Sequence, residues 1–115
     1  MRNDRQNVIV EKTVAFSLAI IKYCEVLEHD RKYVIANQLL KSGTSIGANV
    51  FESQNAESKA DFIHKMKIAA KEACETKYWL ILCEKSEGYR FEEQLRNDLE
   101  VILRILSKII SSLKR

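Results

Sequence analysis

Apolar residues recur every three or four positions in four stretches of the chain, separated by short polar breaks. Such spacing places the apolar side chains on one face of an α-helix. The predicted helices run over Val8–Glu28, Lys32–Ser53, Ser58–Gly88 and Phe91–Leu113. Four helices of similar length with short connections predict an all-α fold. We expect an antiparallel up-down-up-down four-helix bundle that forms a single domain over residues 1–115.

Several of these helices carry a second apolar stripe beside the first. In the first helix the main stripe consists of Val10, Val14, Ser17, Ile21, Cys24 and Leu27, and the second of Phe16, Ala19, Tyr23 and Val26. A bundle needs only one inward face per helix, and surplus apolar surface usually marks an interface. The sequence therefore predicts a homo-oligomer.

The segment Ser42–Glu52 contains two of the three glycines, Gly43 and Gly47, about one turn apart. Glycine inside a helix costs about 1 kcal/mol relative to alanine, so the pair needs a reason. A loop between two helices is one alternative. Both glycines are, however, in phase with an apolar stripe of the second helix, which predicts close packing against another helix. Small residues of the third helix, Ala69 and Ala73, are the expected partners in this helix-packing seam.

The polar breaks contain residues that commonly begin or end helices. Asp30 is the predicted N-cap of the second helix. Ser58, with Asp61 three residues later, predicts a capping box at the start of the third helix. Gly88 is the residue at which the third helix is predicted to stop.

The composition favours a helical protein of a reducing compartment. Proline is absent, charged residues make up 30% of the chain, and the net charge of +3 permits a polyanionic partner without requiring one. The three cysteines, Cys24, Cys74 and Cys83, lie in apolar periodic segments and form no CxxC pair, which favours free thiols over disulfides. No stretch reads as a signal peptide or a membrane span, so we expect a cytoplasmic protein without a membrane partner.

The residues that commonly carry enzyme chemistry do not form a complete set. A carboxylate-bridged di-iron bundle needs a Glu-x-x-His motif on each of two helices, whereas this chain has only Asp61 and His64 at that spacing. Helical ribonucleases of the HEPN class place an arginine a few residues before a histidine, and neither His29 nor His64 has an arginine at those positions. We therefore predict no catalytic residue, no metal ligand and no cofactor. An enzyme with a carboxylate metal site is the most distant alternative.

Two sets of polar residues remain as candidate contact sites. One is a partly buried polar cluster that would set helix register or subunit contacts, with solvated side chains or pairing to nearby lysines as the alternative. Its candidate members are Thr44, Asn49, Glu52, Glu72 and Glu75. The other is a basic surface, which in a ring of identical subunits would be multiplied into a phosphate-binding surface. Its candidate nucleic-acid contacts are Lys59, Lys65, Lys67, Lys71, Arg104, Lys108, Lys114 and Arg115.

Three segments resemble a bacterial protein family: Gln38–Val50, Ser58–Lys65 and Lys71–Leu80. In this order they are similar to the four-helix-bundle proteins encoded within intervening sequences of 23S ribosomal RNA genes. The accessory variability proteins of diversity-generating retroelements are related to that family. The resemblance covers roughly Val8–Leu113 and implies a ring-shaped homopentamer with no assigned catalytic residue. Retroelement members bind nucleic acid and a reverse transcriptase through basic surface; they are markedly basic, whereas this chain has a net charge of only +3.

Together these observations predict a non-catalytic homo-oligomer, a pentamer if it follows the family, that associates with RNA or DNA. A reverse transcriptase or another protein is a further expected partner. The alternative is a protein-binding scaffold without affinity for nucleic acid.

Overall fold

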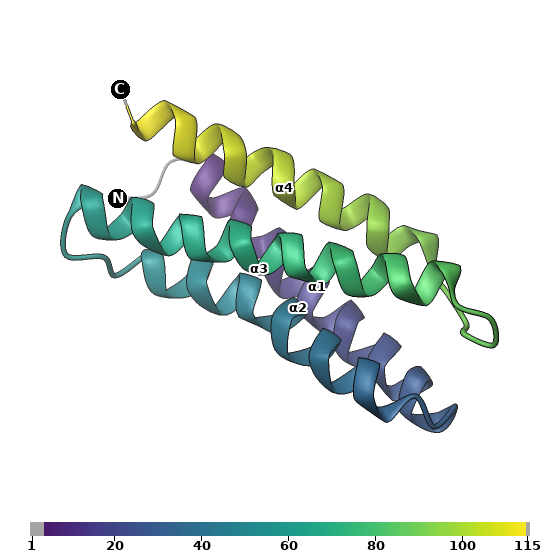
Figure 1. The fold of residues 1–115 in the computed structure, drawn as a ribbon. Coiled ribbons are helices and arrows are strands. Elements are labelled where there is room, and N and C mark those ends of the chain that lie inside the picture. Colours follow the sequence, from purple (N-terminus) through teal and green to yellow (C-terminus); the bar gives the residue numbers. More distant parts are fainter. Residues whose placement is uncertain (1–3, 115) are drawn as a thin grey trace.

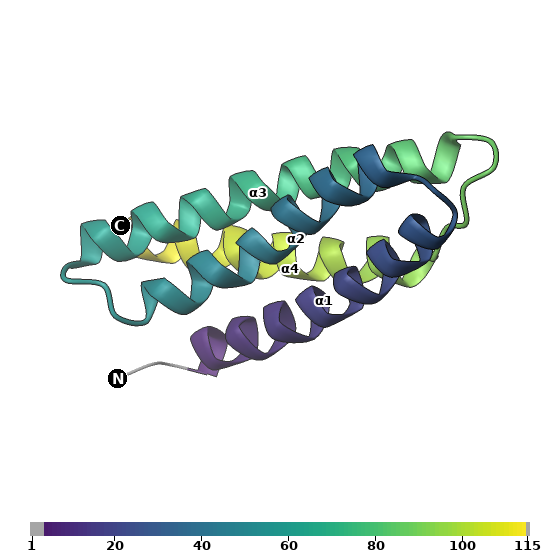
Figure 2. The same cartoon turned by 90° about the horizontal axis from the view of Figure 1, so that it is seen from below.

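The computed structural model describes residues 4–114, with side chains from residue 8 onward, and these residues form four α-helices. The helices are α1 (Asp4–His29), α2 (Tyr33–Ser53), α3 (Lys59–Lys85) and α4 (Glu93–Leu113). The α1–α2 and α3–α4 connections lie at one end of the molecule, and the α2–α3 connection lies at the other (Figures 1 and 2). The chain therefore runs up, down, up and down, as predicted.

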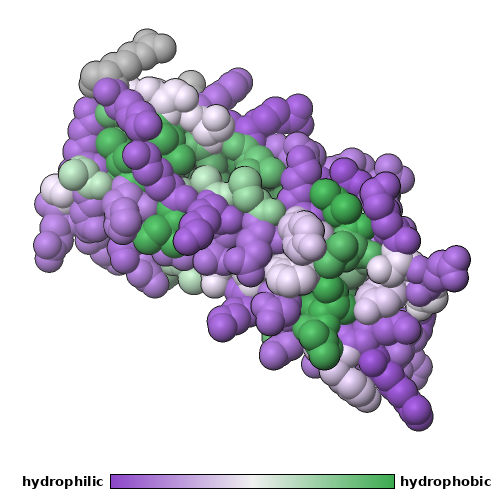
Figure 3. Space-filling view, in the orientation of Figure 1, coloured by the Kyte–Doolittle hydropathy of each residue, from purple (hydrophilic) through white to green (hydrophobic). Residues whose placement is uncertain are grey.

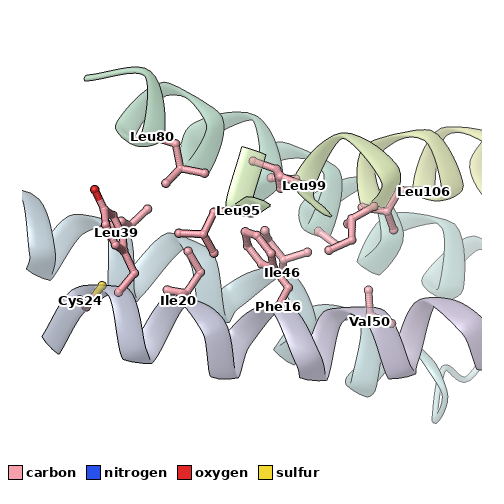
Figure 4. Packing of buried hydrophobic residues seen from close by; sticks show 14 of the residues in the cluster. Phe16, Ile20, Cys24, Leu39, Ile46, Val50, Leu80, Leu95, Leu99 and Leu106 are labelled. Atoms are coloured by element: carbon pink, nitrogen blue, oxygen red, sulfur yellow. The ribbon is translucent and has the colours of Figure 1, made fainter. Parts of the chain in front are cut away.

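The four helices surround one apolar core. α1 and α3 each pack against both α2 and α4, so the helices form a closed ring around the long axis. Side chains from all four helices meet along that axis, as Figure 4 shows for Phe16, Ile46, Leu80 and Leu99. Each fully buried leucine or isoleucine stabilises the fold by about 1.5–3 kcal/mol, so this shared core determines the bundle.

The buried residues of α2, α3 and α4 recur at the three- and four-residue spacing that the sequence predicts, whereas the main stripe predicted for α1 is wrong in part. The buried residues of α1 are Ile9, Thr13, Phe16, Ile20, Tyr23, Cys24 and Leu27. Val14 and Ile21, which the main predicted stripe included, are 50% and 39% exposed. Cys24 and Leu27 of that stripe are buried as predicted, the other buried residues of α1 lie next to it, and part of the apolar surface of α1 faces outward.

Of the three predicted helix ends, one is confirmed by the structure and two are wrong. The Ser58 hydroxyl accepts a hydrogen bond from the Asp61 amide, which confirms Ser58 as the N-cap of α3. The Asp61 carboxylate accepts from the Glu57 amide instead of the Ser58 amide, so the second half of the predicted capping box is not formed. Asp30 is not the N-cap of α2; that position belongs to Lys32, whose side chain makes no capping hydrogen bond. α3 ends at Lys85, and Gly88 instead takes a positive φ of 79° within the turn that follows.

Asp30 is displaced because α1 ends in a Schellman motif. The Lys32 and Arg31 amides donate to the carbonyls of Leu27 and Glu28, and Arg31 adopts a φ of 65°. This reversal turns Asp30 toward the α3–α4 connection. Its carboxylate there accepts two hydrogen bonds from Arg90, at 2.7 and 2.9 Å.

The two glycines of α2 pack against α1, which corrects the expectation that they face α3. A Cβ on Gly43 would lie 2.9 Å from Cγ2 of Ile20, and one on Gly47 would lie 3.2 Å from the carbonyl oxygen of Thr13. Ala69 and Ala73 are buried, but on the face of α3 that holds the core. The segment is therefore a helix in a close helix–helix contact, as predicted, with a different partner.

The buried polar contact between α2 and α3 is made by Ser42 and Thr76. Their hydroxyl oxygens lie 3.0 Å apart, and the Thr76 hydroxyl also bonds the Glu72 carbonyl in its own helix. Both side chains are at most 1% exposed. A hydrogen bond inside an apolar interface favours one register of the two helices, because sliding them would take this partner from the buried Ser42 hydroxyl, while Thr76 would keep the Glu72 carbonyl.

Candidate nucleic-acid interface

The predicted polar cluster does not assemble, because its members make separate local contacts. Thr44 donates to the Leu40 carbonyl and Asn49 to the Ser45 carbonyl, each within α2. The remaining contacts of the set are an ion pair of 3.2 Å between Glu52 and Lys65, and a hydrogen bond of 3.3 Å from the Trp79 indole to Glu75. Glu72 is half-buried and contributes only its main-chain carbonyl. Polar side chains on a helix surface meet such local partners more readily than one another.

The predicted basic residues separate into paired and exposed groups. Lys65 is turned toward α2, where it pairs with Glu52. Arg104 and Lys108 are exposed on α4, whereas Arg115 lies outside the described residues. The remaining exposed members of the set are Lys59, Lys67, Lys71 and Lys114. Within residues 8–114, no salt bridge engages these four lysines.

Three of these lysines surround one hollow where the beginning of α3 meets the end of α4. The hollow has a volume of about 450 Å³ and is open to solvent. It is lined by Lys59, Ala60, Ile63, His64, Lys67, Leu113 and Lys114. No carboxylate is among these lining residues, so cationic side chains around a partly apolar floor dominate its electrostatic character. The sequence placed Lys114 far from α3, and only the folded bundle brings it to Lys59 and Lys67.

The exposed basic residues continue from this hollow along the outside of α3. His64, Lys67, Lys71, Cys74, Tyr78 and Lys85 are all exposed and recur at helical spacing opposite the buried face. We call this line of side chains the outer ridge of α3. In the view of Figure 1, α3 runs along the middle of the molecule, and hydrophilic side chains cover much of this face between apolar patches (Figure 3).

Two exposed carboxylates of α3, Glu75 and Glu84, lie beside the outer ridge and contact other side chains. Glu84 pairs with Arg96 of α4, and Glu75 accepts from Trp79. Lys77, which sits on the α4 side of α3, pairs with Glu100 at 2.8 Å. That contact holds the pKa of Glu100 below its ordinary value. The ridge lysines therefore face solvent, and Glu75, which no salt bridge among the described residues neutralises, is the exposed carboxylate of α3 nearest to Lys71.

A second surface feature is apolar and lies on the opposite pair of helices. Val14, Leu18 and Ile21 of α1 and Phe51 of α2 are 39–63% exposed. A groove of about 370 Å³ runs between the two helices. It is lined by Val14, Ser17, Leu18, Gly47, Ala48, Phe51 and Glu52. Several of the surplus apolar residues of the sequence thus gather at one surface, the α1–α2 groove.

Two thiols and one phenol of the described residues are buried in the core. Burial raises the pKa of Cys24 to about 12, and it also raises the pKa of Cys83, so both thiols stay protonated at neutral pH. Burial likewise raises the pKa of Tyr23, whose hydroxyl donates to the Arg90 carbonyl. Among these residues no three His, Cys, Asp or Glu side chains are close enough to hold a metal ion. No described helix combines the length and apolar character needed to cross a membrane.

Comparison with known proteins assigns the chain to a family. The family model described as "23S rRNA-intervening sequence protein" matches residues 5–111. A crystal structure from Bacteroides thetaiotaomicron VPI-5482, described as a protein with unknown function from the S23 ribosomal protein family, is 42% identical with a TM-score of 0.88. The match covers 93% of this chain and 98% of that chain. No curated protein matches the chain. The chain belongs to the 23S rRNA-intervening sequence protein family.

Proposed function

We propose that this protein is a non-catalytic, homo-oligomeric bundle that associates with RNA or DNA through the basic surface of α3 and the end of α4. The observation that carries the proposal is the convergence of Lys59, Lys67 and Lys114 from two helices on one hollow, with no carboxylate among the described residues that line it. Phosphate groups are the polyanions that such a surface would bind, because each lysine–phosphate contact releases condensed counterions.

The position of the hollow adds to this attraction. It lies at the N-terminal end of α3, where the helix dipole contributes partial positive charge. Lys71 lies four residues beyond Lys67, about one turn or 6 Å further along the same ridge. A nucleic-acid strand that enters the hollow would thus meet further lysines along α3. The resemblance to nucleic-acid-binding retroelement proteins points the same way.

The test is a pair of charge reversals on the outer ridge, Lys67→Glu with Lys71→Glu. The matched control is Lys22→Glu with Lys41→Glu, which makes the same change of charge at exposed positions on α1 and α2. Fluorescence anisotropy with a labelled structured RNA measures binding. We expect the ridge variant to weaken binding about tenfold or more at physiological salt and the control to change it little. Equal losses in both variants would leave only a non-specific effect of net charge.

The α1–α2 groove favours a second candidate, a protein-binding scaffold without affinity for nucleic acid. Its apolar side chains suit a protein surface better than a phosphate backbone. In this case the wild-type protein would not bind RNA or DNA at any salt concentration. The anisotropy measurement therefore separates the two candidates directly.

A further inference from the structure

Tyr78 lies on the outer ridge of α3 between two lysines. Its side chain is 55% exposed, and it lies seven residues after Lys71 and seven before Lys85. Seven residues span about two helical turns, or roughly 10.5 Å, so a lysine flanks the tyrosine on each side at similar distance. A large aromatic side chain exposed at this point is not needed for the core.

The neighbouring Trp79 ring contacts the Tyr78 ring in a T-shaped arrangement and does not stack on it. The two ring centroids are 5.3 Å apart and the planes are inclined by 65°. Trp79 is itself held by the hydrogen bond from its indole nitrogen to Glu75. The two rings therefore contact each other without stacking, and the 55% of the Tyr78 side chain that is exposed remains open to a ligand.

We propose that Tyr78 is a stacking platform for an unpaired base, and that the outer ridge of α3 binds single-stranded rather than fully paired nucleic acid. This inference rests on the proposed function. Bases inside a duplex are already stacked on one another, whereas unpaired bases stack on exposed aromatic side chains. Lys67, Lys71 and Lys85 would bind the phosphates on either side of the stacked base.

The test compares an unstructured uridine-rich RNA with a fully paired RNA duplex of the same length. We expect Tyr78→Ala to weaken binding of the single strand by roughly 5- to 100-fold while leaving duplex binding unchanged. Tyr78→Phe keeps the ring and should retain single-strand binding. Because the chain has one tryptophan, Trp79, its intrinsic fluorescence reports directly on a base that stacks beside it. We expect the single strand to quench this fluorescence and the duplex to leave it unchanged.

The outcomes separate the inference from the function on which it rests. If the Lys67 and Lys71 reversals weaken RNA binding but Tyr78→Ala does not, the platform is wrong and nucleic-acid binding stands. If the wild-type protein binds neither RNA, both are wrong. If Tyr78→Ala changes the sedimentation coefficient of the free protein, Tyr78 belongs to a subunit contact, which also overturns the platform.

Discussion

Gly43 lies so close to Ile20 of α1 that the two helices leave no room for a side chain. A Cβ atom on Gly43 would lie 2.9 Å from Cγ2 and 3.0 Å from Cγ1 of Ile20. Ile20 is fully buried and β-branched, so it has few alternative rotamers into which it can move. The glycine therefore lowers the helix propensity of α2 but allows α1 and α2 to approach closely.

Gly43→Ala tests this reading at the level of one residue. Alanine gains about 1 kcal/mol of helix propensity, and overpacking of a filled core costs about 1–3 kcal/mol. We expect a net destabilisation of about 1 kcal/mol, measured by urea unfolding at fixed protein concentration. In an Ile20→Ala background the obstructing atoms are gone, and Gly43→Ala should become neutral or stabilising. The same loss in both backgrounds would show that Ile20 is not the obstacle.

The elements of the bundle are joined at one end by the pair formed between Asp30 and Arg90. Asp30 follows α1, and Arg90 precedes α4, so their bidentate contact links the α1–α2 and α3–α4 connections. The Tyr23 hydroxyl adds a hydrogen bond from α1 to the Arg90 carbonyl. Two loops that are distant in sequence thereby share one set of contacts.

The pH dependence of stability follows from the same pair. Hydrogen bonding by the Arg90 guanidinium lowers the pKa of Asp30 below its ordinary value of 3.8. A lowered carboxyl pKa contributes stability above the ordinary value, and this contribution is lost as the pH falls through the lowered one. Asp30→Asn should therefore be less stable than wild type at neutral pH, and the difference should shrink below pH about 4. Denaturant unfolding over a pH series measures it; a constant difference down to pH about 2 would contradict the assignment.

The sequence allowed most of each element to be predicted, and the exceptions have physical causes. The buried residues of α2, α3 and α4 follow the three- and four-residue spacing of the sequence. α1 carries two adjacent apolar stripes, so periodicity does not decide which one turns inward. In the structure Ile20 and Thr13 are buried, and they contact the two glycines of α2. The prediction of Asp30 as the N-cap of α2 is wrong because Arg31 adopts a left-handed backbone conformation, so the N-cap is Lys32.

The candidate site was less predictable, because its composition depends on contacts between elements. The lysines of α3 could be predicted from their spacing, and Tyr78 shares that spacing. The pairing of Lys65 with Glu52 and the approach of Lys114 to Lys59 arise only when α2, α3 and α4 come together. Which apolar stripe of α1 faces outward likewise depends on how the four helices pack together.

At the scale of the whole molecule, the basic surface and the apolar surface lie on different helices. The outer ridge belongs to α3, and the α1–α2 groove is lined by residues of α1 and α2. Self-association through the groove would leave the ridge of every subunit exposed. Identical ridges on one assembly would then bind a nucleic acid together, which raises the avidity of a chain whose net charge is only +3.

The proposed self-association predicts the effect of charges placed in the groove. Leu18→Glu with Phe51→Glu puts two carboxylates on the exposed apolar surface, where subunit contact would have to desolvate them. We expect wild type to sediment as an oligomer at micromolar concentration and the variant as a folded monomer. Val34→Glu is the matched control, because Val34 is 81% exposed on α2 but does not line the groove. A monomeric wild type would exclude self-association.

The salt dependence of RNA binding tests the central claim most directly. The logarithm of the binding constant should fall linearly with the logarithm of salt concentration, with a slope of about −0.7 to −0.9 per lysine–phosphate contact. We predict a steep slope for wild type that becomes shallower when Lys67 and Lys71 are replaced by glutamate, and that is unchanged in the control with Lys22 and Lys41 replaced. A wild-type binding constant independent of salt, or the same slope in all three proteins, would contradict the account.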